Sequence, residues 1–539
     1  MVEGSFLAAA AAAPTTVGLP TSGLAGIDYT IVLLYIGGVV AIGSYFGKYV
    51  HSMDDLFLAG KSLPFWAVGM SIVVSDIGAI DFVSGAGGAY KYGIAQANFD
   101  WIGSMPACIV AALIFIPYYW RAGVYTIPEF LGKRYNTAVQ LIEAAIWLFF
   151  MASMLAVMLW VTAVMMKTVL GWSTATSIWL TVAVVGIYTV SGGLTAVVMT
   201  DVIQMIVMFV GAGAFLVLSM AKAGGWSGMV AKVHALGPQY GKHFTMLLPH
   251  GDPTPYPWTG IVFGLGIVLA TAYFVGNQAV IQRALGARTE WDAKAGMLFA
   301  GFLKLFIPIL VIFPGLAALA IYPGLEKADQ AVPMLVRDVL PSGLKGLMFA
   351  GFFAALMSSV DSYLNSCSTM FMSDIYGKAY RALKGLAVPA RQQLWLGRTL
   401  TALLIIGAGF LAPVIERFET IYVAIQTLFS FFQGPTLAIL LLGILWRRAT
   451  RWGALAGLVL GVCLTISLTA MGEGVFPSED PFLFISFWSF VFSTLVTIVV
   501  SLLTRPEPEE KTRGLVFGQV LRDEAVQAAL RGRVNGGKP

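Results

Sequence analysis

The sequence predicts an all-α, polytopic membrane protein. Hydrophobic residues make up 58% of its 539 residues, and charged residues make up only 11%. A soluble domain keeps about 25% of its residues charged, so the main solvent of this chain is lipid. Glycine, which is more frequent in membrane helices than in soluble ones, occurs 59 times. The net charge of +5 is small for this length and does not indicate a nucleic-acid surface.

About thirteen segments are long and apolar enough to cross a bilayer, which takes about 20 residues of helix. In chain order they are 27–46, 64–86, 98–119, 138–169, 174–190, 196–220, 258–282, 295–321, 344–373, 394–414, 421–446, 452–471 and 482–503.

Lysine and arginine concentrate in every second loop, and such residues mark the cytoplasmic side. Examples are Arg121, Lys133 and Arg134 in one loop and Arg447, Arg448 and Arg451 in another. This pattern predicts an N-terminus outside, a C-terminus inside and an odd number of spans. We expect residues 1–26 to be an extracytoplasmic leader, 27–503 a multi-pass domain of the inner (plasma) membrane, and 504–539 a cytoplasmic tail.

Charged side chains inside the spans are the strongest indication of function, because each costs about 2.5–3.5 kcal/mol to insert at mid-bilayer. Six such residues stand out, namely Asp76, Asp81, Asp100, Asp201, Lys304 and Asp361. Glu143, Arg283 and Asp374 lie nearer the ends of their segments, and we expect them at the membrane interface.

The second segment contains the stretch VVSDIGAID, which places Ser75, Asp76 and Gly78 near the bilayer centre. Small and polar residues there predict a broken helix, whose exposed carbonyls can hold a cation or a polar solute. A glycine-rich packing face is the alternative. The two aspartates, Asp76 and Asp81, favour the functional interpretation.

The ninth segment, FAGFFAALMSSVDSYLNS, carries a dense group of side-chain oxygens. Ser358 and Ser362 are four residues apart and share a helix face, close to Asp361. Hard cations prefer oxygen ligands, so this segment is a candidate cation site. Serines that bond to their own backbone or to neighbouring helices are the alternative, but that alternative does not explain the aspartate.

Lys304 lies among apolar residues and needs a carboxylate partner or a wet cavity, unless it snorkels to the interface. Asp81 and Asp100 are candidate partners. The sequence contains no nucleophile–base motif, metal-ligand cluster, P-loop or dinucleotide fingerprint. We therefore expect neither an enzyme nor a bound cofactor.

Six segments together resemble the sodium:solute symporter family, on its sodium/sugar (sodium/glucose) cotransporter branch. They are FLAGKSLPFWAVGMS, YTIPEFLGKRYN, YTVSGGLTAVVMTDVIQ, GNQAVIQRALGAR, FLKLFIPILVIFPG and SSVDSYLNSCSTMFMSDIY. The resemblance covers about residues 28–503. It implies a LeuT-like fold of two inverted five-helix repeats, 64–220 and 258–446, with extra helices at 27–46, 452–471 and 482–503. The first helix of each repeat would be broken around the substrate.

The resemblance also implies ion sites. The main sodium site would use backbone carbonyls of the broken helix and carbonyl and hydroxyl oxygens of the ninth segment, which fall on Val74, Ile77, Ala355, Ser358 and Ser359. Some members of the family bind a second sodium, and the matching positions are Asp201, Asp361 and Ser362. Asp361 stands where those members carry serine or threonine. Two close carboxylates repel, so we expect Asp201 and Asp361 to bind a cation or a proton.

The implied substrate positions are Asp81, Asp100, Trp101, Tyr273, Lys304 and Gln426, with Tyr273 as an inner aromatic gate. Ala270 replaces an asparagine that sugar transporters of this family use. Asp81 and Asp100 make the implied pocket more acidic than the sugar pattern.

The expected function is sodium-coupled symport of a small polar solute, a sugar or a polyol, with Na+ as the coupling ion. The alternatives are symport of an amine, an amino acid or an organic anion, or a membrane sensor domain without transport.

Overall fold

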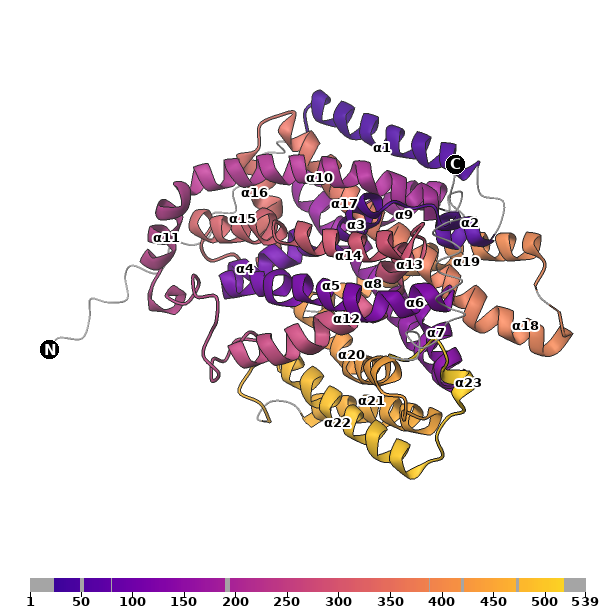
Figure 1. Cartoon of the computed structure of the whole chain (residues 1–539). Helices are drawn as coiled ribbons and strands as arrows, with labels where there is room; N and C mark the ends of the chain where they lie inside the picture. Colours follow the sequence, from indigo (N-terminus) through magenta and orange to yellow (C-terminus); the bar gives the residue numbers. More distant parts are fainter. Residues whose placement is uncertain are drawn as a thin grey trace.

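The computed structural model describes residues 24–48, 53–78, 80–189, 194–386, 388–417, 421–471 and 475–517. These ranges are helical, and they contain two isolated β-bridges but no named strand. The helices lie side by side in one elongated bundle (Figure 1). Most of the predicted leader, residues 192–193 of the GGLTA element and the last part of the predicted tail lie outside the described residues.

The first half of the chain begins with α1 (Gly26–Gly47) and the short α2 (Met53–Leu58). A bent pair follows, made of α3 (Phe65–Asp76) and the joined η2 (Asp81–Gly85) and α4 (Ala86–Tyr92). The next span runs through η3 (Ile94–Ala97), η4 (Phe99–Ser104), α5 (Met105–Val110), η5 (Ala111–Phe115) and α6 (Ile116–Ala122). It is followed by α7 (Ile127–Arg134), α8 (Thr137–Leu170), α9 (Thr174–Thr189), α10 (Leu194–Ala223) and the outer-loop helix α11 (Gly225–Ala235).

The second half begins with another bent pair, η7 (Gly260–Leu269) and α12 (Ala270–Gly276) followed by α13 (Gln278–Leu285). Next come α14 (Glu290–Lys304), α15 (Ile307–Ile321), α16 (Ala331–Val339), α17 (Leu344–Met370), η9 (Phe371–Tyr376) and α18 (Gly377–Lys384). The last helices are α19 (Ala390–Leu411), α20 (Ile421–Leu445), α21 (Arg451–Met471), α22 (Phe482–Leu503) and α23 (Glu509–Thr512).

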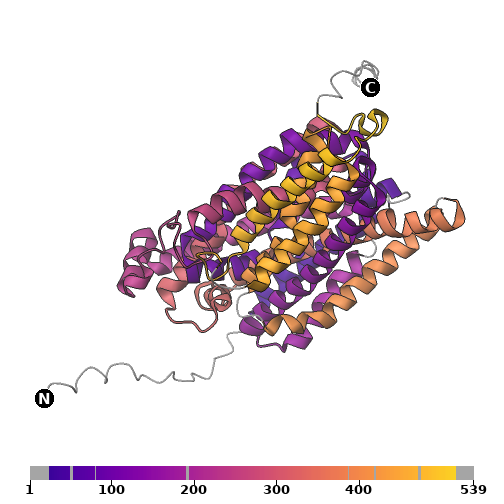
Figure 2. The same ribbon diagram turned by 90° about the horizontal axis from the view of Figure 1, so that it is seen from below.

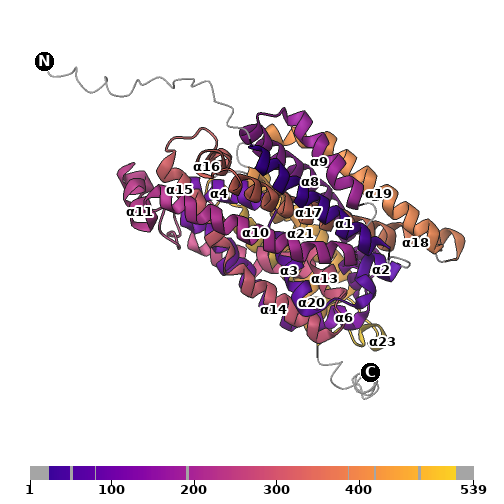
Figure 3. The ribbon, with the colours of Figure 1, turned by 90° about the horizontal axis from the view of Figure 1, so that it is seen from above.

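Every predicted membrane segment has a helical counterpart. Among the described residues, ten helices are long and apolar enough to cross a bilayer, and two further spans are the bent pairs. The remaining predicted segment corresponds to α9, whose apolar part Thr174–Gly186 is shorter. The helices α11 and α18 lie at opposite ends of the bundle (Figures 1 and 3), as the predicted alternation of loops requires.

The two bent helices break at polar residues near their middles. The first pair bends by 61° between Asp76 and Asp81, and the second bends by 54° at Asn277. The Asn277 side chain accepts a hydrogen bond of 2.9 Å from Ala279 N, which caps the start of α13. Both breaks occur in the segments that the family resemblance implies to be broken, each the first helix of a predicted repeat.

The helices α20, α21 and α22 pack together at one side of the bundle, in orange and yellow in Figure 2. Glycines allow the close approach of α21 and α22. A Cβ atom at Gly453 would lie 2.1 Å from Ser501 Oγ, and one at Gly457 would lie 2.0 Å from Thr497 Oγ1. Small residues four apart let membrane helices approach closely. Here they let α21 and α22 pack tightly against each other, and both helices contact α20.

Candidate functional site

The break after α3 leaves carbonyl oxygens without helical partners. In a continuous helix, Gly78 N would donate to Val74 O, but it donates instead to Asp81 Oδ2 at 2.9 Å. The backbone at Ile77 is extended, with φ −93° and ψ 92°. The carbonyls at the end of α3 are therefore available to a cation, because the last carbonyls of a helix have no N–H to accept from.

The serines of α17 lie directly against this break. Ser359 Oγ donates to the carbonyl oxygen of Ser75 at 3.0 Å, and the hydroxyls of Ser75 and Ser358 are 3.0 Å apart. A Cβ atom at Gly78 would lie 2.9 Å from Ser359 Oγ, so a larger residue there would require the serine side chain to move. Of the predicted main-site residues, Val74 lies in α3 and Ile77 follows its end. The others, Ala355, Ser358 and Ser359, lie in α17, which is in contact with α3.

Arg283 of α13 lies beside this site and not at the membrane interface, where we expected it. The residue is 1% exposed. Its Nη2 donates to Ser75 Oγ at 2.6 Å and pairs with Asp201 Oδ2 at 3.2 Å, and its Nε donates to Ser71 Oγ at 2.5 Å. Hydropathy places an arginine near the end of an apolar run at the interface, whereas the kink at Asn277 carries this one into the protein.

The predicted second sodium site is therefore next to a guanidinium. Arg283 also donates to Ser362, and Asp201 accepts hydrogen bonds from Ser71 and, at 2.6 Å, from Ser358. Asp361 is buried and accepts from Thr189 of α9. Arg283 supplies positive charge to Asp201, so a second cation there has to compete with it.

A cavity of about 140 Å³ opens next to the break, and it is lined by five of the six predicted substrate residues. They are Asp81, Asp100, Tyr273, Lys304 and Gln426. The sixth, Trp101, donates its indole N–H to the carbonyl of Leu305 at 3.0 Å. This bond holds η4 against the break between α14 and α15, where Pro308 has no N–H for the carbonyl of Lys304.

Lys304 finds its carboxylate partners within the cavity. Its Nζ pairs with Asp100 Oδ1 at 2.9 Å, as predicted, and also with Asp76 Oδ2. Asp76 is therefore a pocket residue outside the predicted set of substrate residues. Its position at the predicted helix break was the sequence feature that could have indicated this role. Asp81 lines the same cavity. Three carboxylates and one ammonium make the pocket acidic.

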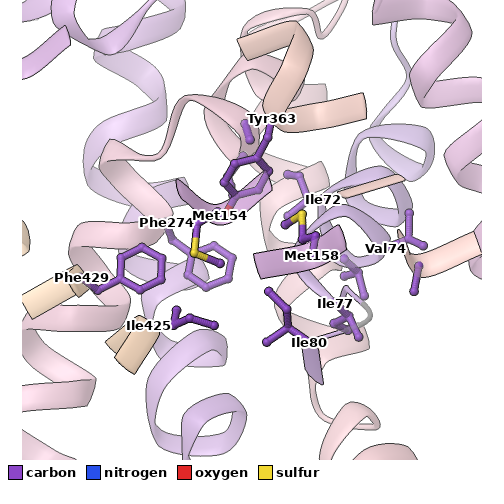
Figure 4. Packing of buried hydrophobic residues seen from close by; sticks show 14 of the residues in the cluster. Ile72, Val74, Ile77, Ile80, Met154, Met158, Phe274, Tyr363, Ile425 and Phe429 are labelled. Atoms are coloured by element: carbon purple, nitrogen blue, oxygen red, sulfur yellow. The ribbon is translucent and has the colours of Figure 1, made fainter. Parts of the chain in front are cut away.

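Aromatic and apolar side chains form the rest of the pocket wall. The hydroxyls of Tyr273 and Tyr363 are 3.5 Å apart, and the rings of Tyr273 and Phe429 are 5.5 Å apart between centroids. Figure 4 shows Ile425 and Phe429 together with Phe274, across from Ile77 and Ile80. These side chains give the pocket an apolar wall beside its carboxylates. Gln96 and Gln433, which sequence reasoning missed, also line the cavity.

Two further acidic residues expected at the interface are buried inside the protein. Glu143 accepts hydrogen bonds from Trp147 Nε1 at 3.1 Å and from Thr436 Oγ1 at 2.7 Å. Asp374 accepts from Thr126 Oγ1 at 3.0 Å and Gln140 Nε2 at 2.6 Å. The bonds to Thr436, Thr126 and Gln140 connect different segments of the bundle, whereas the bond to Trp147 lies within α8. The second oxygen of each carboxyl has no partner among the described residues, so these bonds offset only part of the lost solvation.

Two broken helices, backbone and hydroxyl oxygens at the first break and a polar pocket beside it form the arrangement by which secondary transporters bind cargo near the middle of the membrane. The model of the sodium:solute symporter family matches residues 56–461. The chain belongs to this family and is a sodium-coupled solute symporter.

Relatives and solved structures agree with this assignment. A "Sodium/glucose cotransporter" of Vibrio parahaemolyticus is 33% identical over 508 residues, which cover 89% of this chain and 91% of the relative. A "Sodium/myo-inositol cotransporter 2" of Oryctolagus cuniculus is 30% identical, over 93% of this chain and 80% of the relative.

The structure of a Na+-coupled sialic acid symporter matches with a TM-score of 0.78 at 22% identity, over 90% of this chain and 99% of the other. The nucleobase-cation-symport-1 transporter Mhp1 matches with a TM-score of 0.55 at 12% identity, over 86% and 99%. These two likenesses confirm the predicted LeuT-like fold.

Proposed function

We propose that the protein imports a sugar or a polyol together with sodium. The observation that carries this proposal is the position of the polar cavity, which shares Ser75 with the α3–α17 contact. A sodium ion held by the carbonyls of Val74, Ile77 and Ala355 and the hydroxyls of Ser358 and Ser359 would lock the break against α17. It would thereby order the adjacent wall of the substrate pocket. The named activities of the relatives, transport of glucose and of myo-inositol, support the same substrate class.

The energy of one sodium ion is sufficient for accumulation. A charge that moves through 100 mV releases about 2.3 kcal/mol, and a tenfold sodium gradient adds about 1.4 kcal/mol. Their sum corresponds to an accumulation of roughly several hundredfold per sodium ion. Rocking of one group of helices against the other would expose the pocket to each side in turn.

An amine or amino acid is the second candidate substrate class. Asp76 and Asp100 share Lys304, whereas Asp81 adds a third carboxylate to the same cavity. An ammonium group would neutralise that remaining charge. An organic anion fits less well, because the pocket carboxylates outnumber the lysine.

The proposal is tested with the purified protein in proteoliposomes. An inward sodium gradient should drive uptake of one member of a panel of sugars, polyols, amines and carboxylates, and an equal potassium gradient should not. Equal uptake in sodium and potassium would contradict sodium coupling, and uptake of an amine alone would select the second candidate.

Replacement of Ser359 by alanine should weaken the apparent affinity for sodium by about 10–100-fold. The hydroxyl would be lost from an ion-binding set in which a bond to a charge is worth about 1.5–3 kcal/mol. The measurement is the sodium concentration for half-maximal solute uptake. Ser373→Ala, a variant at the far end of the same helical span, is the matched control and should leave that concentration unchanged. An unaltered sodium response of Ser359→Ala would remove Ser359 from the main site.

Replacement of Asp361 by asparagine tests the second sodium site. If Asp361 and Asp201 bind a second sodium ion with Ser362, the Hill coefficient for sodium should fall from about 2 to about 1, since one site would lose its charge. Uptake is measured at a saturating solute concentration while sodium is varied. A Hill coefficient that is the same in both proteins would exclude Asp361 from sodium coupling. Asp201 would then act only as the ion-pair partner of Arg283.

A further inference from the structure

Gln433 is a buried amide on the cavity wall. It lies on α20 and is 1% exposed. Ile425, Phe429 and Gln433 follow one another at intervals of four residues, so they share a helix face, and all three line the cavity. Within the described part of the chain, neither Oε1 nor Nε2 of Gln433 has a hydrogen-bond partner. Buried amides without partners are rare in folded proteins and need an explanation.

Gln96 repeats this feature on a different element. It belongs to η3, is buried, lines the same cavity, and its Oε1 has no partner among the described residues. Gln282, a buried glutamine outside the cavity, instead donates from Nε2 to Phe57 O at 2.7 Å. The two cavity glutamines are therefore placed to bind something that enters the cavity.

We propose that the carboxamide of Gln433 binds two adjacent hydroxyl groups of the solute, and that it thereby selects a neutral vicinal diol over an amine or a carboxylate. This inference rests on the proposed function and specifies its substrate class. The argument is one of matching donors and acceptors. A carboxamide presents one acceptor, Oε1, beside a donor group, Nε2.

A hydroxyl both donates and accepts, so one hydroxyl of a vicinal diol can donate to Oε1 while its neighbour accepts from Nε2. An ammonium group only donates and would leave Nε2 unpaired. A carboxylate only accepts and would leave Oε1 unpaired. A buried polar atom left unpaired by the wrong ligand is the usual source of strong discrimination at such sites. The carboxylates and Lys304 across the cavity bind the remaining hydroxyls.

The test compares wild type with Gln433→Met in proteoliposomes under an inward sodium gradient. The solutes are D-glucose, myo-inositol, their monodeoxy analogues, ethanolamine and lactate. For the transported polyol, wild type should show a half-saturation concentration about tenfold lower than Gln433→Met. One deoxy analogue should be about tenfold weaker than its parent in wild type and equal to its parent in the variant.

Gln204→Met is the matched control. Gln204 is also a buried glutamine, but it lies on α10 and does not line the cavity. Its replacement should leave the half-saturation concentrations unchanged. Should Gln433→Met not fold, Gln433→Glu serves instead: it keeps an acceptor, loses the donor, and should weaken the polyol relative to ethanolamine.

The outcomes separate this inference from the proposed function. Equal polyol affinities of wild type and Gln433→Met, or a deoxy penalty that persists in the variant, would overturn the role of Gln433. Sodium-driven uptake of ethanolamine or lactate without any polyol would overturn it too, while sodium symport would stand. A wild-type protein that moves no solute with sodium would refute the proposed function, and the inference with it.

Discussion

Replacement of Arg283 by methionine should lower the free energy of unfolding by about 3–5 kcal/mol, because it removes one partner of a buried ion pair. Asp201 would keep its hydrogen bonds from Ser71 and Ser358 but would lose the guanidinium that neutralises it. The lost bonds to Ser75 and Ser362 would add to the effect, since these serines lie at the contact between α3 and α17. The measurement is the denaturation midpoint of the purified protein in detergent.

Two variants make this result interpretable. Arg288→Met removes an arginine of the same region that is 56% exposed and paired with Asp292, and it should cost less than about 1 kcal/mol. The double variant Arg283→Met, Asp201→Asn should recover much of the loss, because no buried charge is then left unpaired. Equal effects of Arg283→Met and Arg288→Met would mean that the Arg283–Asp201 pair does not stabilise the fold.

Replacement of Lys304 by methionine should abolish solute uptake and destabilise the protein by about 3–5 kcal/mol. Lys304 is 4% exposed and holds Asp76 and Asp100 together across α3, η4 and α14. Without the ammonium, these carboxylates would repel each other beside the substrate cavity. Uptake should fall at least about 100-fold, which corresponds to about 2.7 kcal/mol, because the pocket would lose both a donor and its geometry.

Lys294→Met is the matched control for this lysine. Lys294 lies on the same helix, α14, and forms a surface pair with Glu290 at 3.2 Å. Its loss should leave uptake within about a factor of two of wild type, as expected of an exposed ion pair. Uptake by Lys304→Met at the wild-type rate would show that the cluster is structural and that Lys304 does not contribute to the substrate pocket.

Local patterns in the sequence predicted much of the site. The broken helix followed from Ser75, Asp76 and Gly78 in an apolar segment, and the partnership of Lys304 with Asp100 followed from the cost of an unpaired charge. The resemblance to known symporters then placed the serines of α17 at the break. These predictions depend on short spacings along the chain or on the solvation of single residues, and both can be read from the sequence.

Contacts between distant segments were harder to predict. Arg283 and Asp201 are 82 residues apart, and hydropathy alone placed Arg283 at the interface. Lys304 pairs with Asp76 and Asp100, whereas the sequence predicts Asp81 and Asp100 as its partners. No local pattern distinguishes Gln433, because a glutamine in an apolar helix becomes informative only when its lack of hydrogen-bond partners is known.

The sequence by itself determined that this chain is a helical membrane protein with two interrupted helices, because the transfer of each residue from water to lipid depends on its own side chain and near neighbours. Only the tertiary structure decided which charges neutralise each other and which polar groups remain for a ligand. Electrostatic pairing and hydrogen bonding in a low-dielectric interior depend on distances of a few ångströms between helices, and those distances arise only when the bundle is packed.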